Sequence, residues 1–169
     1  QPEFAHIPMI LGTDGRKLSK RHGATAVGDY QHLGILPSAM RNFLALLGWS
    51  PGGDREVMAQ DELIGLFSRG GLLRKAAVFD LKKLDWLNGV HLRRLDTDDF
   101  ASRLLPFLHA DGVLGSDPSL GELARLRRVA ELIQTRIAHL TEAGPLVAPF
   151  YVADDGVDVA DDARSQPVQ

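Results

Sequence analysis

The stretch Asp80-Leu81-Lys82-Lys83-Leu84-Asp85-Trp86-Leu87-Asn88-Gly89 decides the fold class, because it carries both a start signal and a stop signal for a helix. The carboxylate of Asp80 can accept hydrogen bonds from the first free N–H groups of a helix. Gly89 can adopt the left-handed conformation that ends one. The stretch therefore predicts a short helix that begins after Asp80 and ends at Gly89.

Two further helices are predicted upstream of this stretch. Pro37 suits a first helical position, and apolar residues follow it at spacings of three and four up to Gly48. The second helix begins near Asp61, where carboxylates complement the helix dipole. Gly70-Gly71 is expected to end it.

Two more helices are predicted downstream. The first covers about residues 97–109, and Pro106 is expected to bend or shorten it, because proline lacks the N–H group that a helix interior uses. The second covers about residues 119–140, with apolar residues on one side and arginines largely elsewhere. Gly144-Pro145 is expected to interrupt whatever continues it.

The amino-terminal residues predict a small β element. Residues 7–11 are largely apolar, Gly12-Thr13-Asp14-Gly15 can turn the chain, and basic residues follow the turn. Asp-Gly is the strongest part of this signal, because glycine takes the positive φ of a tight turn without steric cost. The predicted fold class is therefore mostly α, opening with a short β-hairpin.

The composition excludes several classes of protein. The chain has 169 residues, of which 44% are hydrophobic and 24% charged, as in ordinary globular proteins. Apolar runs such as residues 43–47 are far shorter than the ~20 residues that a membrane-spanning helix needs. There is no cysteine and the histidines are scattered, so no metal site is expected. The net charge of -3 argues against nucleic-acid binding over the whole surface, but not against a local basic patch.

Lys17-Leu18-Ser19-Lys20-Arg21 is the stretch with the clearest chemistry. Two lysines that flank a serine on a glycine-bordered loop can bring positive charge and backbone N–H groups to a polyphosphate. A cation beside a departing pyrophosphate stabilises the transition state of adenylate formation, and Lys20 is predicted to supply it. As a bare pattern, however, a basic turn is more often solvated surface.

The residues around the loop change that weighing. Residues 4–24 resemble, nearly residue for residue, the signature-loop region of bacterial glutamyl-tRNA synthetases. Further segments similar to the family follow in its order at residues 30–37, 42–51 and 77–89. The resemblance is firm to about Leu108. Beyond it, residues 129–151 resemble more loosely the first helices of the family's anticodon-binding bundle.

The resemblance implies a class I aminoacyl-tRNA synthetase that uses ATP, with Mg²⁺, to activate L-glutamate and then passes the glutamyl group to tRNA(Glu). Lys20 matches the second lysine of the family's KMSKS-type motif and is expected to contact ATP. Lys17 and Ser19 match the first lysine and the serine, with supporting catalytic and ATP-binding roles, and Arg21 is expected to join the ATP site. Leu18 and Arg21 replace two residues of the generic motif, as is ordinary in the glutamate-specific branch.

The resemblance also divides the chain. Residues 1–25 are expected to end a catalytic domain, residues 26–115 to form the helical domain that contacts the tRNA stem, and residues 116–169 to begin an α-helical anticodon-binding bundle with an acidic tail. The sequence contains neither the family's H-x-G-H signature nor its glutamate pocket, since the stretch at His32 matches only in part. The chain is therefore expected to be a fragment, inactive alone, of a cytoplasmic enzyme whose oligomeric state stays open.

Several side chains have two interpretations. Trp49 and Trp86 could stack on RNA bases, but packing in the core at a helix end is favoured for both. His32 is interpreted as helix-end surface. Four arginines at positions 125, 127, 128 and 136, with the pairs Lys82-Lys83 and Arg93-Arg94, could contact tRNA phosphates or simply form solvated helix faces.

Three rival functions compete with glutamate–tRNA ligation. The glutaminyl branch replaces the anticodon-binding helices with β-barrels, and the helical pattern of residues 119–140 disfavours it. A relative that modifies a tRNA base with glutamate lacks any anticodon-binding part. The alternative from a different class is a non-catalytic helical tRNA-binding module of synthetase ancestry.

Overall fold

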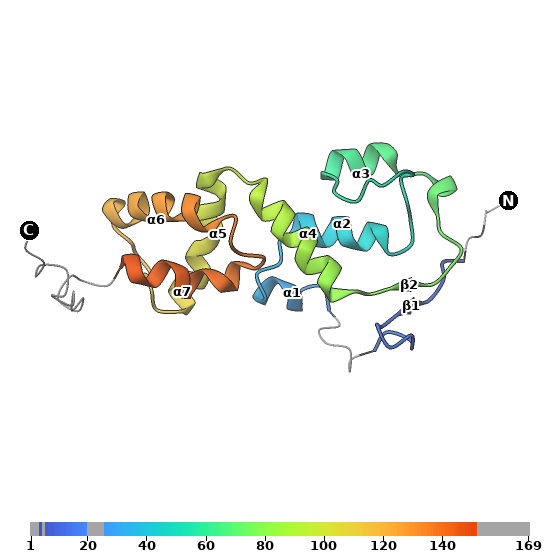
Figure 1. Ribbon diagram of the computed structural model, residues 1–169, viewed down its shortest axis with the longest axis horizontal. Helices are drawn as coiled ribbons and strands as arrows, with labels where there is room; N and C mark the ends of the chain where they lie inside the picture. The colour runs from blue at the N-terminus through green and yellow to red at the C-terminus, as the bar shows by residue number, and fades with distance from the viewer. Residues whose placement is uncertain (1–3, 5, 20–25, 152–169) are drawn as a thin grey trace, which may run out of the picture.

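The structure is a computed structural model that describes residues 4, 6–19 and 26–151. Helices make up most of it, and the molecule is elongated, with β1 and α3 toward one end, α6 and α7 toward the other, and α4 between them (Figure 1). The predicted mostly α fold is confirmed. In the part of the chain that is described, no helix is both long and apolar enough to cross a membrane.

The elements follow one another in a simple order. The two short strands are β1 (Ile10–Leu11) and β2 (Ala77–Val78). The helices are α1 (Asp29–His32), α2 (Pro37–Leu46), α3 (Gln60–Leu66), α4 (Leu81–Arg93), α5 (Thr97–Ala110), α6 (Leu120–Ile133) and α7 (Ala143–Val147). Single 3₁₀ turns lie at Arg69–Gly71, Leu140–Glu142 and Ala148–Phe150.

The helix starts agree with the sequence signals. Pro37 is the first residue of α2, and the Asp80 carboxylate accepts a hydrogen bond of 2.9 Å from Lys82 N at the start of α4. At α6, Ser119 and Glu122 form a capping box, because each side chain accepts a bond from the other residue's backbone N–H. The hydrogen bonds from Ser119 also lower the pKa of Glu122.

Two predicted helix breakers do not break their helices. Gly89 lies inside α4, which continues to Arg93, so the predicted end at Gly89 is wrong. The low helix propensity of glycine, ~1 kcal/mol against alanine, is offset by burial of Leu92 in the turn that follows. Pro106 lies inside α5, which runs on to Ala110, because fully buried Leu104 and Leu108 hold the helix on both sides of the proline.

The last predicted helix is shorter than expected. α6 ends at Ile133, so the prediction of one helix over residues 119–140 is wrong. The Gln134 side chain instead donates hydrogen bonds to Leu92 O (2.8 Å) and Leu95 O (2.9 Å), at the end of α4. Gly144 lies within α7 and does not interrupt it, and the Asp111 side chain packs closely against it. Helix α3 likewise ends before Gly70-Gly71, at Leu66.

The amino-terminal turn is confirmed, but its main strand partner lies far along the chain. Gly15 has φ of +73°, and an antiparallel bridge joins Leu11 to Lys17. β1 also pairs in parallel with β2, with Ile10 opposite Ala77. The strand before the predicted phosphate loop is thus fixed to the segment that leads into α4.

Two apolar cores hold the helices. One core lies between α2 and α4, and its buried members include Tyr30, Phe43, Leu84 and Leu87. The other lies among α5, α6 and α7, and Leu36, Ala39 and Leu92 enter it from the α2 and α4 side. Because these residues cross from one side to the other, the two halves of the described chain share buried surface.

A buried amide and a buried imidazole brace the first core. Asn42 on α2 donates to Glu56 O (2.9 Å) and accepts from Met58 N (2.8 Å), while His91 Nε2 lies 3.1 Å from Asn42 Oδ1. Because that amide oxygen can only accept, Nε2 of His91 is the donor. Burial, with the nearby charges of Arg94 and Arg41, lowers the pKa of His91.

The lowered pKa of His91 predicts a pH dependence of stability. In the unfolded chain His91 becomes protonated at about pH 6.5, whereas in the folded chain its lowered pKa keeps it neutral at that pH. Stability should therefore be complete above about pH 6.5 and decline as the pH falls through the lower folded-state pKa. Urea unfolding of the wild type and of His91→Gln between pH 8 and pH 5 measures this. As the pH falls, the urea midpoint of the wild type should decrease by more than that of His91→Gln. Parallel decreases in the two proteins would contradict the prediction.

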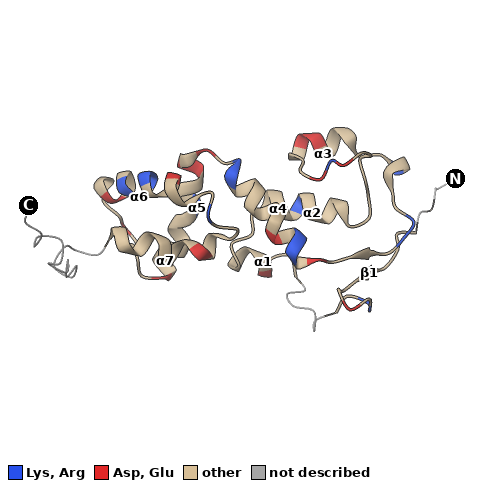
Figure 2. Ribbon diagram, viewed as in Figure 1, with Lys and Arg blue, Asp and Glu red and all other residues tan. Residues whose placement is uncertain are grey.

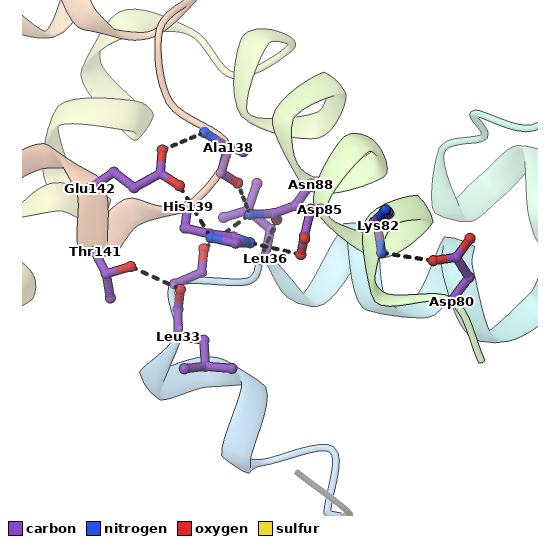
Figure 3. Close-up of polar contacts among 11 residues, drawn as sticks. Leu33, Leu36, Asp80, Lys82, Asp85, Asn88, Ala138, His139, Thr141 and Glu142 are labelled. Atoms are coloured by element: carbon purple, nitrogen blue, oxygen red, sulfur yellow. Dashed lines mark hydrogen bonds and ion pairs between the residues drawn. The ribbon is translucent and has the colours of Figure 1, made fainter. Parts of the chain in front are cut away.

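A second buried amide joins three segments of the chain. Asn88 on α4 accepts a hydrogen bond from Leu36 N (2.8 Å) and donates to Gly34 O (3.1 Å) and to Ala138 O (Figure 3). Gly34 has φ of +79°, and a Cβ on it would lie 2.5 Å from Leu140 N. The turn before α2 and the segment before α7 therefore meet α4 at this amide.

Truncation of Asn88 should be strongly destabilising. In Asn88→Ala, Leu36 N–H and Ala138 C=O lose their hydrogen bonds to the Asn88 side chain, and an unsatisfied buried polar group costs ~1–3 kcal/mol. We expect the free energy of unfolding, measured by urea titration, to fall by about 2–4 kcal/mol. Ser102→Ala, at an exposed position of α5, is the matched control and should change it by no more than ~0.5 kcal/mol. Equal effects of the two substitutions would contradict this account.

Candidate functional site

The predicted phosphate loop leaves the end of β1. Gly12 N donates to Arg16 O (2.8 Å) and Leu18 N to Ile10 O (3.0 Å), so the chain is held in a tight turn up to Leu18. The Lys17 side chain is exposed and Ser19 is half-buried. Lys20 and Arg21, the other two residues predicted for the ATP site, lie outside the described residues. A lysine on a fixed turn is suited to an anionic ligand, since its charge is available and its backbone is already ordered.

The loop is attached to α4 through backbone hydrogen bonds. Beyond the β1–β2 pair, Phe79 N donates to Leu11 O (2.8 Å). The Phe79 ring packs edge-on against Phe43, with 4.9 Å between ring centroids, and lies 6.1 Å from the Tyr30 ring. The next residue, Asp80, caps α4. The predicted loop and α4 therefore belong to one continuously bonded unit.

Basic residues lie along α4 and on α6 (Figure 2). Lys82 and Arg93 on α4 and Arg94 just after it are exposed, whereas Lys83 pairs with Glu56 through its ammonium group. Exposed cations of this kind can neutralise the phosphates of a nucleic acid without reading its sequence. The phosphate-contact interpretation of these residues stays a prediction.

Two of the four arginines considered for tRNA binding have roles within the fold. Arg125 donates to Phe150 O (3.0 Å) and lies 5.5 Å from the centroid of the Tyr151 ring. Arg127 forms an ion pair of 2.7 Å with Asp98 on α5. Arg128 and Arg136 are exposed. Arg125 and Arg127 are thus explained by contacts that hold α6 to its neighbours, without a tRNA.

The two tryptophans differ from each other. Trp49 is buried, at 2% exposed, and its ring lies 5.7 Å from that of Phe67, so core packing is confirmed for it. Trp86 is 46% exposed, so the prediction that it packs in the core is wrong. The buried face of α4 is formed by Leu84, Leu87 and Asn88, and the helical turn of about 100° per residue directs position 86 away from it.

The sequence predicted that His32 lies on the surface at a helix end and that no metal site is present. His32 is exposed in the last turn of α1, as predicted. Among the residues that the structure describes, no group of three or more His, Asp or Glu side chains could hold a metal ion.

Sequence reasoning missed the residues that connect the loop to the rest of the chain. The pairing of β1 with β2 has no local signal, because it depends on residues far apart in the sequence. Asn88 had one: it is a polar residue on the face of α4 that carries Leu84 and Leu87, and a polar residue on a buried face needs hydrogen-bond partners. His139, which contacts Asp85 on α4, could not have been found from spacing.

Comparisons with known proteins agree with this geometry. Residues 1–86 match the family described as tRNA synthetases class I (E and Q), catalytic domain. A glutamate–tRNA ligase of Desulforudis audaxviator is 44% identical over 153 residues, which are 90% of this chain and 30% of the relative. That of Heliobacterium modesticaldum is 39% identical over 164 residues, or 97% of this chain and 33% of the relative.

A solved structure extends the match to three dimensions. The crystal structure of a glutamate tRNA ligase from Elizabethkingia meningosepticum in complex with its amino acid aligns with a TM-score of 0.75 and 26% identity, and covers 94% of this chain and 34% of that chain. The chain spans about a third of the length of these relatives. The resemblance stated from the loop residues is confirmed, and the chain belongs to the class I tRNA synthetases of the glutamate and glutamine branch.

Proposed function

We propose that this chain is part of a longer glutamate–tRNA ligase, which joins L-glutamate to tRNA(Glu) at the expense of ATP in the cytoplasm. The observation that carries the proposal is the stretch at residues 17–21, which leaves a hydrogen-bonded turn within the family match over residues 1–86. The relatives named above are glutamate–tRNA ligases, and their similarity spans nearly the whole of this chain.

The first chemical step is adenylate formation. A carboxylate oxygen of glutamate attacks the α-phosphorus of ATP, the bond to the β-phosphate oxygen breaks, and pyrophosphate leaves with the electron pair. Negative charge grows on that leaving group, and a cation that contacts it more strongly in the transition state than in bound ATP accelerates the step. Lys20 takes this role in our proposal.

The neighbours of Lys20 hold the triphosphate in place. Lys17 has an exposed ammonium group, Ser19 can donate a hydroxyl hydrogen bond, and Arg21 can donate two parallel bonds to phosphate oxygens. Mg²⁺ accompanies ATP, bound chiefly through phosphate oxygens. Because the chain is ordered up to Leu18 by β1, the loop starts from a fixed backbone, which reduces the entropy lost on binding.

The helices support a tRNA-binding role for the rest of the chain. The exposed cations of α4 and α6 offer phosphate contacts on a helical scaffold. Helical structure over α5, α6 and α7 favours the glutamate branch over the glutaminyl branch, in which β-barrels are expected at that point. With no H-x-G-H string or glutamate pocket in these 169 residues, we propose that the chain alone is inactive.

Substitution of Lys20 tests the proposal. In the full-length parent protein, Lys20→Ala should lower the rate of ATP–pyrophosphate exchange, with glutamate and tRNA present, by roughly a hundredfold or more. The fall should appear mainly in kcat, because the interaction is made in the transition state. Lys75→Ala, at an exposed lysine outside the loop, is the matched control and should leave the rate unchanged.

Two results would count against the proposal in different ways. An active parent that is indifferent to Lys20→Ala would remove the site assignment and leave the enzyme class intact. A parent with no exchange that still binds tRNA would favour a non-catalytic helical tRNA-binding module.

A further inference from the structure

The described chain consists of two units that meet at one joint. We call β1, β2 and α1 to α4 the loop unit, and α5 to α7 the three-helix unit. They lie end to end along the molecule (Figure 1). The covalent link between them, residues 94–96, is short. Their relative orientation therefore depends on non-covalent contacts. These are the shared apolar core, the bonds from Gln134 to the end of α4, and the contacts where α4 meets the segment before α7.

Hydrogen bonds from the loop unit reach that segment at several points. Asn88 donates to Ala138 O, Leu140 N donates to Gly34 O (3.3 Å), and Thr141 Oγ1 donates to Leu33 O (3.2 Å). The bonds of Asn88 and Thr141 come from different elements, α4 and the segment before α7 (Figure 3). Because hydrogen bonds are directional and apolar burial is not, these bonds restrict the angle between the two units more than an apolar contact alone would.

A second set of contacts clasps the same joint from its surface. His139 Nε2 lies 3.0 Å from Asp85 Oδ1 on α4, and His139 Nδ1 lies 3.3 Å from Glu142 Oε1 (Figure 3). Glu142 also accepts a bond of 3.0 Å from Ala138 N, which fixes its own position. The imidazole is thus held within the three-helix unit and reaches across to α4.

The joint is connected to the phosphate loop by a rigid element. α4 carries Asp85 and Asn88 and has 13 residues, so it is about 20 Å long. Its start at Asp80 directly follows the strand that pairs with β1. A change of angle at the joint therefore alters where the three-helix unit lies relative to the loop.

We propose that Asn88 and His139 are positioning residues for the transfer reaction, because they fix the orientation of the three-helix unit relative to the phosphate loop. The inference rests on the proposed function: one tRNA has to lie against the helices and reach the adenylate at the same time. A misplacement of about 1 Å at a reacting centre can cost about a hundredfold in rate, so a joint of fixed angle has a direct kinetic benefit.

His139 is the better residue to test, because its loss separates orientation from folding. The side chains of His139 and Asp85 are 25% and 43% exposed, and ion pairs at such positions contribute little to stability. His139→Ala should therefore fold, whereas Asn88→Ala removes buried contacts. His139→Gln retains an amide that can donate to Asp85 and should restore part of the wild-type behaviour.

The first experiment measures the orientation itself and does not depend on catalysis. The chain has no cysteine, so spin labels can be placed at Lys75→Cys in the loop unit and Glu131→Cys in the three-helix unit, both exposed. The distance distribution between the labels should be narrow in the wild type and about twofold broader in His139→Ala and Asp85→Ala. Asp99→Ala is the matched control, because it breaks an ion pair within α5, to Arg103, and should leave the distribution unchanged.

The second experiment measures aminoacylation by the full-length parent. His139→Ala should raise KM for tRNA about tenfold, leave KM for ATP unchanged, and recover partly in His139→Gln, while Asp99→Ala should change neither constant. Unchanged distance distributions in both His139→Ala and Asp85→Ala would overturn the inference. So would a broadened distribution with an unchanged KM for tRNA in an active parent. A parent that aminoacylates nothing would refute the proposed function, and the distance measurement would still decide whether the joint is fixed by His139.

Discussion

The side-chain amide of Asn88 is the contact on which the arrangement of this chain depends. It satisfies backbone groups in the turn before α2 and in the segment before α7, which no ladder or helix pairs for them. Such groups are costly when buried without partners, and water cannot reach them here because Asn88 and Leu36 are buried. Apolar packing draws the two halves together, and the amide determines the geometry at which they stay.

Much of the helical architecture is readable from the sequence because capping is local. Pro37 and Asp80 state where their helices begin, and the structure agrees. Helix ends were less predictable, since a glycine or proline ends a helix only when no residue beyond it would be stabilised by burial if the helix continued. Leu92 beyond Gly89 and Leu108 beyond Pro106 are buried, and their burial stabilises the continued helices. Knowledge of which face is buried comes only from the tertiary fold.

For the candidate site too, the sequence indicates the local features and not the long-range contacts. Its chemistry stays a prediction: lysines flanking a serine on a glycine-bordered loop suit a polyphosphate, and the resemblance of the surrounding residues favours this interpretation over a solvated basic turn. The contacts that hold the loop in place could not be predicted, because β2 and Asn88 lie far from the loop in sequence and reach it only through folding. The different environments of Trp49 and Trp86 make the same point, since both follow local patterns typical of a helix end and only one is enclosed.

The parallel pairing of Ile10 with Ala77 has a consequence for how the protein is made. Strand β1 is synthesised before β2, and it has no partner until the chain has been extended through α2 and α3 to β2. At ~5–20 residues per second, that interval lasts several seconds. During it, β1 is an unpaired strand beside apolar residues such as Ile7 and Met9, and is therefore open to chaperones and to mispairing. The strand that leads into the predicted phosphate loop can therefore pair only after α2 and α3 have been translated.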